Sequence, residues 1–309
     1  MKKWKILLMY SIIGIIIIGS SFYLFINKNE AESEIEEPVI LLQNDKTTLT
    51  VNKSIYQRIL SNTTSNITSF KVKCTNIIPE VYKNKTIDYF IGSNYTKDHD
   101  IYQISYVSNS SNRRLSFQNE GVISYYDPDV TGIIPISEAE SNSSLLKKCK
   151  NIFNKIGINQ SNLQLHSIKN SIASSYNSNT KKRTILGYGD QTVVFNQCIN
   201  GYVVDGEKGR ITLRFGKDAK LSIFRDDRII ISEIIYKQKK INSLNDTVSK
   251  MSLYSSQLPE GENQLIDWDL VVYVPSFETI PINGYNLHYI FRFAPKDSSK
   301  VRYVVIPSD

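Results

Sequence analysis

The segment from Ile6 to Ile26, near the start of this chain, is mostly hydrophobic and contains no charged residue. An apolar helix of about 20 residues spans the hydrocarbon core of a bilayer. Lys2, Lys3 and Lys5 precede the run, and retained lysines keep the near side of such a helix in the cytoplasm. We therefore expect residues 1–28 to form a cytoplasmic tip and a single-pass anchor in the cell membrane, with the rest of the chain extracytoplasmic.

A cleavable signal peptide is the alternative interpretation of the same run. Gly19, Ser20 and Ser21 are small residues of the kind that a signal peptidase accepts. However, residues 22–26 keep the run apolar beyond that point, and no Ala-x-Ala pattern is present. These two observations favour a retained anchor.

After the anchor, short segments of alternating polar and apolar residues predict a strand-rich external domain over residues 51–135. Residues 29–50 are acidic, contain Pro38 and lack periodicity, which predicts a stalk. A short helix is expected at Lys53–Leu60. The expected strands are Phe70–Cys74, Ile87–Ile91, Ile101–Val107, Arg114–Gln118 and Val122–Tyr126.

The pattern changes to helical spacing at Ser137, where a second unit, residues 136–236, is expected to begin. Ser137 and Glu140 have the spacing of a capping box, and Gly157 supplies a stop, so one helix is predicted between them. Its apolar face, which includes Cys149 and Phe153, should lie across a sheet. A polar loop is predicted over residues 170–183. The expected strands are Leu163–Ile168, Thr192–Cys198, Tyr202–Val204, Arg210–Phe215, Leu221–Phe224 and Arg228–Tyr236.

A third unit, residues 237–309, repeats the order of a helix followed by strands. Its helical spacing runs from Ile241 to Leu258, and its strands are expected at Leu270–Val274, Leu287–Phe293 and Val301–Ile306. The patterns together predict an α+β fold, in which an N-terminal transmembrane helix precedes repeated units of one helix on an antiparallel sheet.

The second unit resembles PepSY-type domains and the external domains of the YycI and YycH regulators. The similar features are a helix ending in Ile156-Gly157-Ile158, the strand at residues 193–197 and the bend at residues 199–204. The resemblance implies cystatin-like or PepSY-like units with a regulatory, non-catalytic binding role. YycI-type proteins bind a membrane sensor kinase, so the resemblance also implies a membrane or envelope partner.

Charge and cysteine content restrict the function only weakly. The net charge is +7 over 309 residues, and the basic clusters at residues 147–150 and 181–183 are short, so nucleic acid is not indicated. An ordinary solvated surface is favoured over binding of anionic lipid or wall polymer. Of Cys74, Cys149 and Cys198, the last two could approach across the helix and sheet, but free thiols are expected.

Residues with catalytic or metal-binding potential are isolated along the chain. His99, His166 and His288 lack the spacing of a zinc site, and the glycines at residues 187–189 are not followed by a helix that could hold phosphate. We therefore predict no catalytic, cofactor-binding or metal-binding residues, no cofactor, and no enzymatic activity.

The strongest catalytic candidates are Asp267 and Asp269, which flank Trp268 and could act on a sugar ring stacked on the indole. Residues two apart on a strand share a face. The favoured interpretation is instead that Trp268 packs inward while both aspartates face solvent. Two functions therefore stay open: a membrane-anchored regulatory or binding protein, and a cell-envelope enzyme or accessory that acts on wall polymer or glycan.

Overall fold

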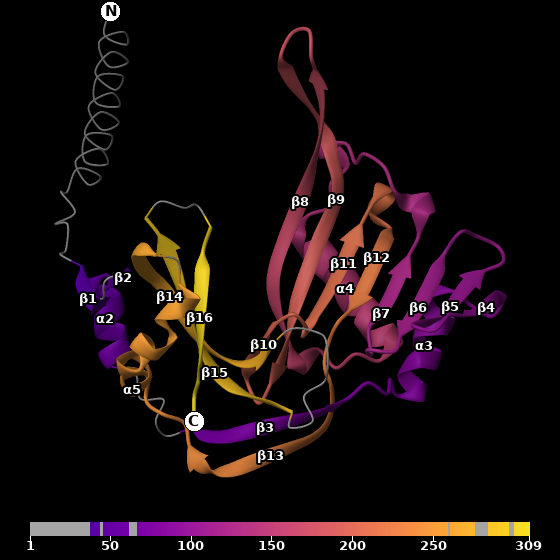
Figure 1. Ribbon diagram of the computed structural model, residues 1–309. Helices are drawn as coiled ribbons and strands as arrows, with labels where there is room; N and C mark the ends of the chain where they lie inside the picture. Colours follow the sequence, from indigo (N-terminus) through magenta and orange to yellow (C-terminus); the bar gives the residue numbers. More distant parts are fainter. Residues whose placement is uncertain (1–37, 44–45, 62–66, 259, 276–283, 297–299) are drawn as a thin grey trace, which may run out of the picture.

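The computed structural model describes residues 38–43, 46–61, 67–258, 260–275, 284–296 and 300–309 (Figure 1). The predicted membrane helix at residues 6–26 lies outside these ranges. Within them, no helix is long and apolar enough to cross a membrane.

The described strands belong to one mixed, sixteen-stranded sheet. Its main path runs in the order β13-β3-β15-β14-β10-β9-β11-β12-β7-β6-β5-β4. The strands are β1 (Val39–Gln43), β2 (Thr47–Val51), β3 (Thr68–Thr75), β4 (Tyr95–His99), β5 (Gln103–Ser108), β6 (Arg114–Gln118), β7 (Ile123–Tyr126), β8 (Leu163–Asn177), β9 (Lys182–Ile199), β10 (Tyr202–Gly206), β11 (Arg210–Phe215), β12 (Leu221–Asp226), β13 (Ile230–Lys240), β14 (Gly261–Val274), β15 (Tyr285–Pro295) and β16 (Arg302–Pro307).

The expected fold of repeated helix-on-antiparallel-sheet units is therefore wrong. Strands assigned to different units pair with one another: β12 pairs with β7, and β3 pairs with both β13 and β15. The sheet is also not purely antiparallel, because β10 runs parallel to β14 and β2 runs parallel to β14. Such long-range pairings satisfy backbone groups that separate units would leave at exposed edges.

The helices differ from expectation in number and position. The helix α2 (Lys53–Leu60) has the predicted bounds, whereas α3 (Glu80–Phe90) occupies the position of the strand expected at residues 87–91. The region predicted as helical from Ile241 contains only α5 (Leu244–Ser249) and a 3₁₀ segment at Met251–Gln257. The strand β1 and all of β2 except Val51 lie within the segment predicted as a stalk.

The helix α4 (Asn142–Ile156) begins later than predicted. Ser141, not Ser137, is its N-cap, and the Ser141 hydroxyl accepts a hydrogen bond from the backbone N–H of Ser144 at 3.3 Å. Residues 136–138 form a separate 3₁₀ turn. The predicted end at Gly157 is confirmed, because this residue has φ +83°, a left-handed conformation that glycine adopts without strain.

The described core consists of two hydrophobic clusters. In one, α3 and α4 pack against β5, β6, β7, β8, β9, β11 and β12, and the rings of Phe153 and Phe195 meet edge to face at 5.1 Å. The predicted packing of this helix on the sheet around Val193 and Leu213 is thus confirmed. In the other cluster, α5 packs with β2, β3, β14, β15 and β16. Each cluster combines segments that are distant in the sequence.

The strands β8 and β9 form a long hairpin that projects beyond the rest of the molecule (Figure 1). Most of the polar loop expected over residues 170–183 is therefore strand. At the base of the projection, Ile134 and Tyr188 exchange backbone hydrogen bonds of 2.7 and 2.9 Å. Gly187 permits this contact, since a Cβ there would lie 2.3 Å from the carbonyl oxygen of Ile134. The glycine-spaced segment serves the strand and does not form a phosphate loop.

Candidate functional site

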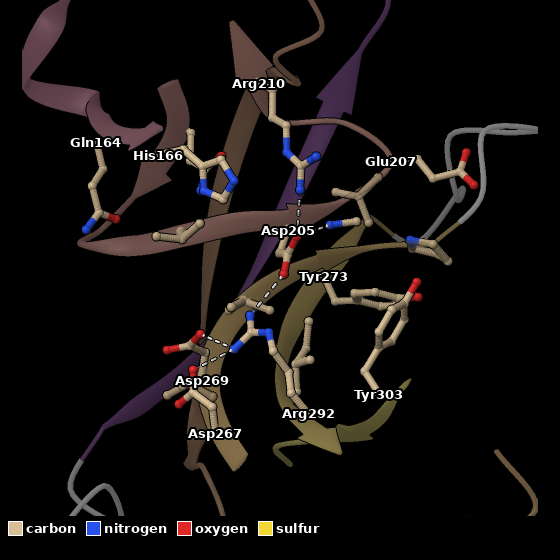
Figure 2. Close-up of a pocket in the computed structure, with 18 of the residues that line it drawn as sticks. Gln164, His166, Asp205, Glu207, Arg210, Asp267, Asp269, Tyr273, Arg292 and Tyr303 are labelled. Atoms are coloured by element: carbon tan, nitrogen blue, oxygen red, sulfur yellow. Dashed lines mark hydrogen bonds and ion pairs between the residues drawn. The ribbon is translucent and has the colours of Figure 1, made fainter. Parts of the chain in front are cut away.

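A cleft of about 1010 Å³ lies where β10 joins β14, between the two halves of the sheet (Figure 2). Residues from β8, β9, β10, β11, β14, β15 and β16 line it. The turn after β10 depends on Gly206, because a Cβ at this position would lie 1.9 Å from the carbonyl oxygen of Val274. Close approach of these two backbones places side chains from distant strands around one cleft.

Arg292 is the centre of an ion-pair cluster on one wall of the cleft (Figure 2). Its Nη1 lies 2.6 Å from Oδ2 of Asp269 and 3.4 Å from Oδ2 of Asp267, and its Nη2 lies 3.6 Å from Oδ2 of Asp205. Partial burial alone would lower the pKa of Arg292, but its bond to Asp269 and the three carboxylates raise that pKa. The guanidinium therefore stays charged and holds both of the predicted catalytic candidates.

Asp205 connects the two arginines of the cleft. Its Oδ1 lies 3.3 Å from Nη2 of Arg210 and accepts a 2.8 Å hydrogen bond from the backbone N–H of Gly206. Two buried polar atoms in the cleft lining, Nε of Arg210 and Oδ1 of Asn196, have no hydrogen-bonding partner within the part of the chain that the structure describes. Buried polar groups are normally paired, so these two atoms could bond a polar ligand.

His166 is the histidine that the fold brings into this cleft. Its Nδ1 lies 3.3 Å from Nδ2 of Asn196. Burial lowers the pKa of His166, and the nearby positive charges of Arg210 and Lys169 lower it further. The imidazole is therefore neutral at physiological pH and can offer one donor and one acceptor.

The other two histidines lie elsewhere. His99 ends β4, which is exposed along its length at the edge of the sheet, and Nδ1 of His288 contacts the backbone oxygen of Asn286 at 3.1 Å. Among the described residues, no group of three His, Cys, Asp or Glu side chains could hold a metal ion.

Trp268 lies on the opposite face of β14 from Asp267 and Asp269. It packs against the core, with its ring 6.4 Å from that of Tyr289, and its buried Nε1 has no described partner. The interpretation that Trp268 packs inward is confirmed. The side chains of both aspartates are 54% exposed, as expected, but they are bound to Arg292 and not surrounded by water alone. A sugar ring therefore cannot stack on Trp268 while it contacts these carboxylates.

The aromatic surface of the cleft comes instead from Tyr273 and Tyr303 (Figure 2). Burial raises the pKa of Tyr273, and the neighbouring Tyr303, Asp205 and Glu207 raise it further, so the phenol stays neutral. The lining has four carboxylates, which belong to Asp205, Glu207, Asp267 and Asp269. Those of Asp205 and Glu207 lie near the tyrosine rings. The local charge is negative because the described lining offers only two arginines in return.

Sequence patterns did not identify the residues that complete the cleft. Arg292 lies in a strand that its apolar residues predict. His288, Ile290 and Arg292 are each two residues apart, and this spacing indicates that they share one face of the strand. Asp205 directly follows the expected strand Tyr202–Val204, and Arg210 begins the expected strand Arg210–Phe215, so neither position carries a local signal of a binding site. Their proximity to Arg292 depends on the parallel pairing of β10 with β14, which no local pattern encodes.

No protein-family model and no curated protein matches this chain. The crystal structure of an uncharacterized protein from Eubacterium rectale is similar over 87% of this chain and 90% of its own, at 9% sequence identity and a TM-score of 0.44. A similarity of this size carries no argument about function.

Proposed function

We propose that this protein is a non-catalytic, membrane-anchored binding protein of the cell exterior, whose cleft holds a positively charged group of a membrane or envelope partner, such as a sensor kinase. The observation that carries the proposal is the ion-pair cluster in which Arg292 binds Asp267, Asp269 and Asp205. The apolar run at residues 6–26 and the resemblance to regulatory domains support the same function.

The ion pairs argue against glycoside hydrolysis. A glycosidase normally uses two carboxyl groups on opposite sides of the scissile bond, one of them a proton donor. Asp267 and Asp269 instead come from one face of one strand and share one guanidinium. This arrangement provides fixed charge but no separated acid and nucleophile.

The composition of the lining indicates the charge of the bound group. Four carboxylates face two arginines, so the cleft has an excess of negative charge. Tyr273 and Tyr303 lie beside Asp205 and Glu207, and a cation is attracted both to carboxylates and to the faces of aromatic rings. A lysine or arginine side chain, or the amine of a peptide, matches these features.

Photo-cross-linking of the full chain in native membranes tests the proposal. A benzophenone amino acid placed at Tyr303 should give a specific cross-link, and Asp205→Asn with Glu207→Gln should abolish it. The same amino acid at Tyr126, which is exposed but outside the cleft, is the matched control. Equal cross-linking from both positions would contradict a partner in the cleft.

The enzymatic alternative makes a different prediction. If the protein acts on wall polymer, the full chain should hydrolyse peptidoglycan or a glycan, and Asp267→Asn or Asp269→Asn should abolish that activity. Hydrolysis with this dependence would overturn the binding proposal. Our expectation is no turnover by either the native chain or the variants.

A further inference from the structure

The outer part of the β8–β9 hairpin, residues 171–189, is a ribbon of only two strands, which we call the arm. β9 pairs with β11 from Gln191 inward, so the arm lies beyond that pairing. Its described contact with the body is the bridge between Ile134 and Tyr188 at its base. A two-stranded hairpin is marginally stable in water, and this one leaves both faces open.

Large apolar side chains on the arm are exposed to solvent. The exposed fractions are 58% for Ile172, 66% for Tyr176, 57% for Ile185 and 48% for Leu186. No other strand of the described sheet covers them. A soluble arm would normally place polar residues at such positions, so the apolar residues indicate that something covers the arm.

The register of the two strands places Tyr176 and Ile185 on one face of the arm together with Arg183. Tyr176 is directly opposite Arg183, and Ser174 is directly opposite Ile185. Arg183 Nε donates a 2.7 Å hydrogen bond to Ser174 Oγ, so the side chains of Arg183 and Ser174 lie on the same face of the hairpin. Because opposite residues share a face, Tyr176, Ile185 and Arg183 lie together near the tip.

The charge of the arm has one sign. No Asp or Glu occurs between Ser141 and Gly189, whereas Lys181, Lys182 and Arg183 lie consecutively at the tip. The two lysines are exposed. A short basic cluster alone is typical of a solvated surface, but here it adjoins exposed aliphatic and aromatic side chains.

We propose that the arm lies on the surface of an anionic lipid bilayer. The cations contact lipid headgroups, while Tyr176 and Ile185 enter the boundary between headgroups and acyl chains. Basic residues near a membrane gain attraction from anionic lipid, and tyrosine prefers this boundary. An anionic wall polymer would attract the cations equally, but it offers no apolar layer for the isoleucines. The proposal is independent of the cleft and of its ligand.

The test uses the full chain reconstituted in vesicles, with an environment-sensitive fluorophore on Ser178→Cys at the tip and with Cys74→Ser and Cys198→Ser to prevent other labelling. In vesicles of phosphatidylcholine with phosphatidylglycerol, the emission should shift to shorter wavelength relative to phosphatidylcholine alone. The combined change Lys181→Glu, Lys182→Glu and Arg183→Glu should lower the ratio of docked to undocked arm by roughly a hundredfold.

Matched controls separate this surface from general charge and apolar effects. Lys147→Glu, Lys150→Glu and Lys155→Glu change the net charge equally on the exposed side of α4 and should leave the emission unchanged. Tyr176→Ser with Ile185→Ser should weaken docking, whereas Ile77→Ser with Leu253→Ser, at even more exposed positions outside the arm, should not. Far-ultraviolet circular dichroism verifies folding of each variant.

Three outcomes would overturn the proposal: equal emission in both kinds of vesicle, equal loss in the control variants, or a shift caused by soluble polyphosphate and not by vesicles. The last outcome would assign the arm to an anionic polymer.

Discussion

Arg292 on β15 and Asp269 on β14 form a 2.6 Å charge-assisted hydrogen bond across two neighbouring antiparallel strands. The same guanidinium is within ion-pairing distance of Asp267, which is also on β14, and of Asp205 on β10. One cation thus offsets three carboxylates, and it links the antiparallel pair β14 and β15 to β10, which runs parallel to β14. The cleft depends on this cation more than on any single carboxylate.

Removal of the positive charge of Arg292 should lower the stability of the protein. We expect Arg292→Met to lower the free energy of unfolding by about 1 to 3 kcal/mol at neutral pH, because partly buried polar groups lose their partner. The pKa of Arg292 is raised by folding, so its contribution is fully present below the ordinary arginine pKa and is constant over the usual pH range. Urea denaturation of the native chain and the variant measures the difference.

Two substitutions serve as controls for this experiment. Arg292→Lys keeps the charge and should recover part of the stability. Asp267→Asn removes a half-exposed carboxylate and should change the unfolding free energy by less than about 1 kcal/mol. If Arg292→Met is as stable as the native chain, the ion-pair cluster does not organise the cleft.

A second ionic cluster, which is largely buried, joins α3 to the end of β12. Tyr82 Oη donates to Oδ2 of Asp226 at 2.7 Å, and Arg228 binds the same carboxylate with Nε at 2.8 Å and Nη2 at 2.7 Å. Burial alone would raise the pKa of Asp226, but the charge of Arg228 and the hydrogen bonds from Arg228 and Tyr82 lower it. The cluster therefore makes stability depend on pH in the acid range.

The sign follows from the lowered pKa. Stability from Asp226 is fully present above the ordinary aspartate pKa of about 3.9 and is lost as the pH falls through the lower folded value. Asp226→Asn should cost about 3 to 5 kcal/mol at pH 7, since Arg228 is left buried without its counter-charge. It should also flatten the loss of stability below about pH 4. Asp218→Asn, an exposed control, should do neither.

The core under α4 gives a third prediction. Phe153 is 1% exposed and packs on Phe195, so Phe153→Ala should lower the unfolding free energy by about 3 to 5 kcal/mol. Asn154→Ala, on the exposed side of the same helix, should change it little. A loss below about 1 kcal/mol for Phe153→Ala would be incompatible with this packing.

Membrane topology is the fourth prediction. The lysines before residue 6 keep the N-terminal end of the chain in the cytoplasm and place the folded part outside. If residues 6–26 are a retained anchor, protease added to intact spheroplasts should therefore digest the chain from residue 38 onward. Permeabilised cells are the control for protease activity. Protection of the folded part in intact cells would contradict the topology, and a mature N-terminus near Phe22 would contradict the retained anchor.

Local patterns predicted some elements with their correct bounds. Gly157 ends α4 as expected, and the strands at Arg114–Gln118 and Arg210–Phe215 have the predicted bounds. The strand predicted at Ile87–Ile91 is wrong, because a short apolar run is compatible with either a strand or a helix. The segment belongs to α3, which buries Thr86, Ile87 and Phe90 on one side.

Pairing between distant strands could not be predicted, and the same limit applies to the cleft. Asp267 and Asp269 could be recognised as a pair because residues two apart on a strand share a face. Arg292 and Asp205 come from two other strands, and only the sheet order brings them to those carboxylates. The arm was missed because its outer half has few apolar residues, and its hydrogen bonds come from a partner strand and not from burial.

The cysteines provide the last prediction. All three are free thiols, and strand alternation explains why the pair considered for a bridge is unbonded. Cys149 lies on the buried face of α4, which packs on the Phe195 face of the sheet, whereas Cys198 lies on the opposite face of β9. Burial raises the pKa of Cys149 to about 12. Since the thiolate is the reactive form, a thiol reagent at pH 8 should modify Cys198 in the native protein and leave Cys149 intact until the chain unfolds. Peptide mass mapping without reduction locates each modified thiol, and modification of Cys149 as rapid as that of Cys198 would show that α4 does not cover this part of the sheet.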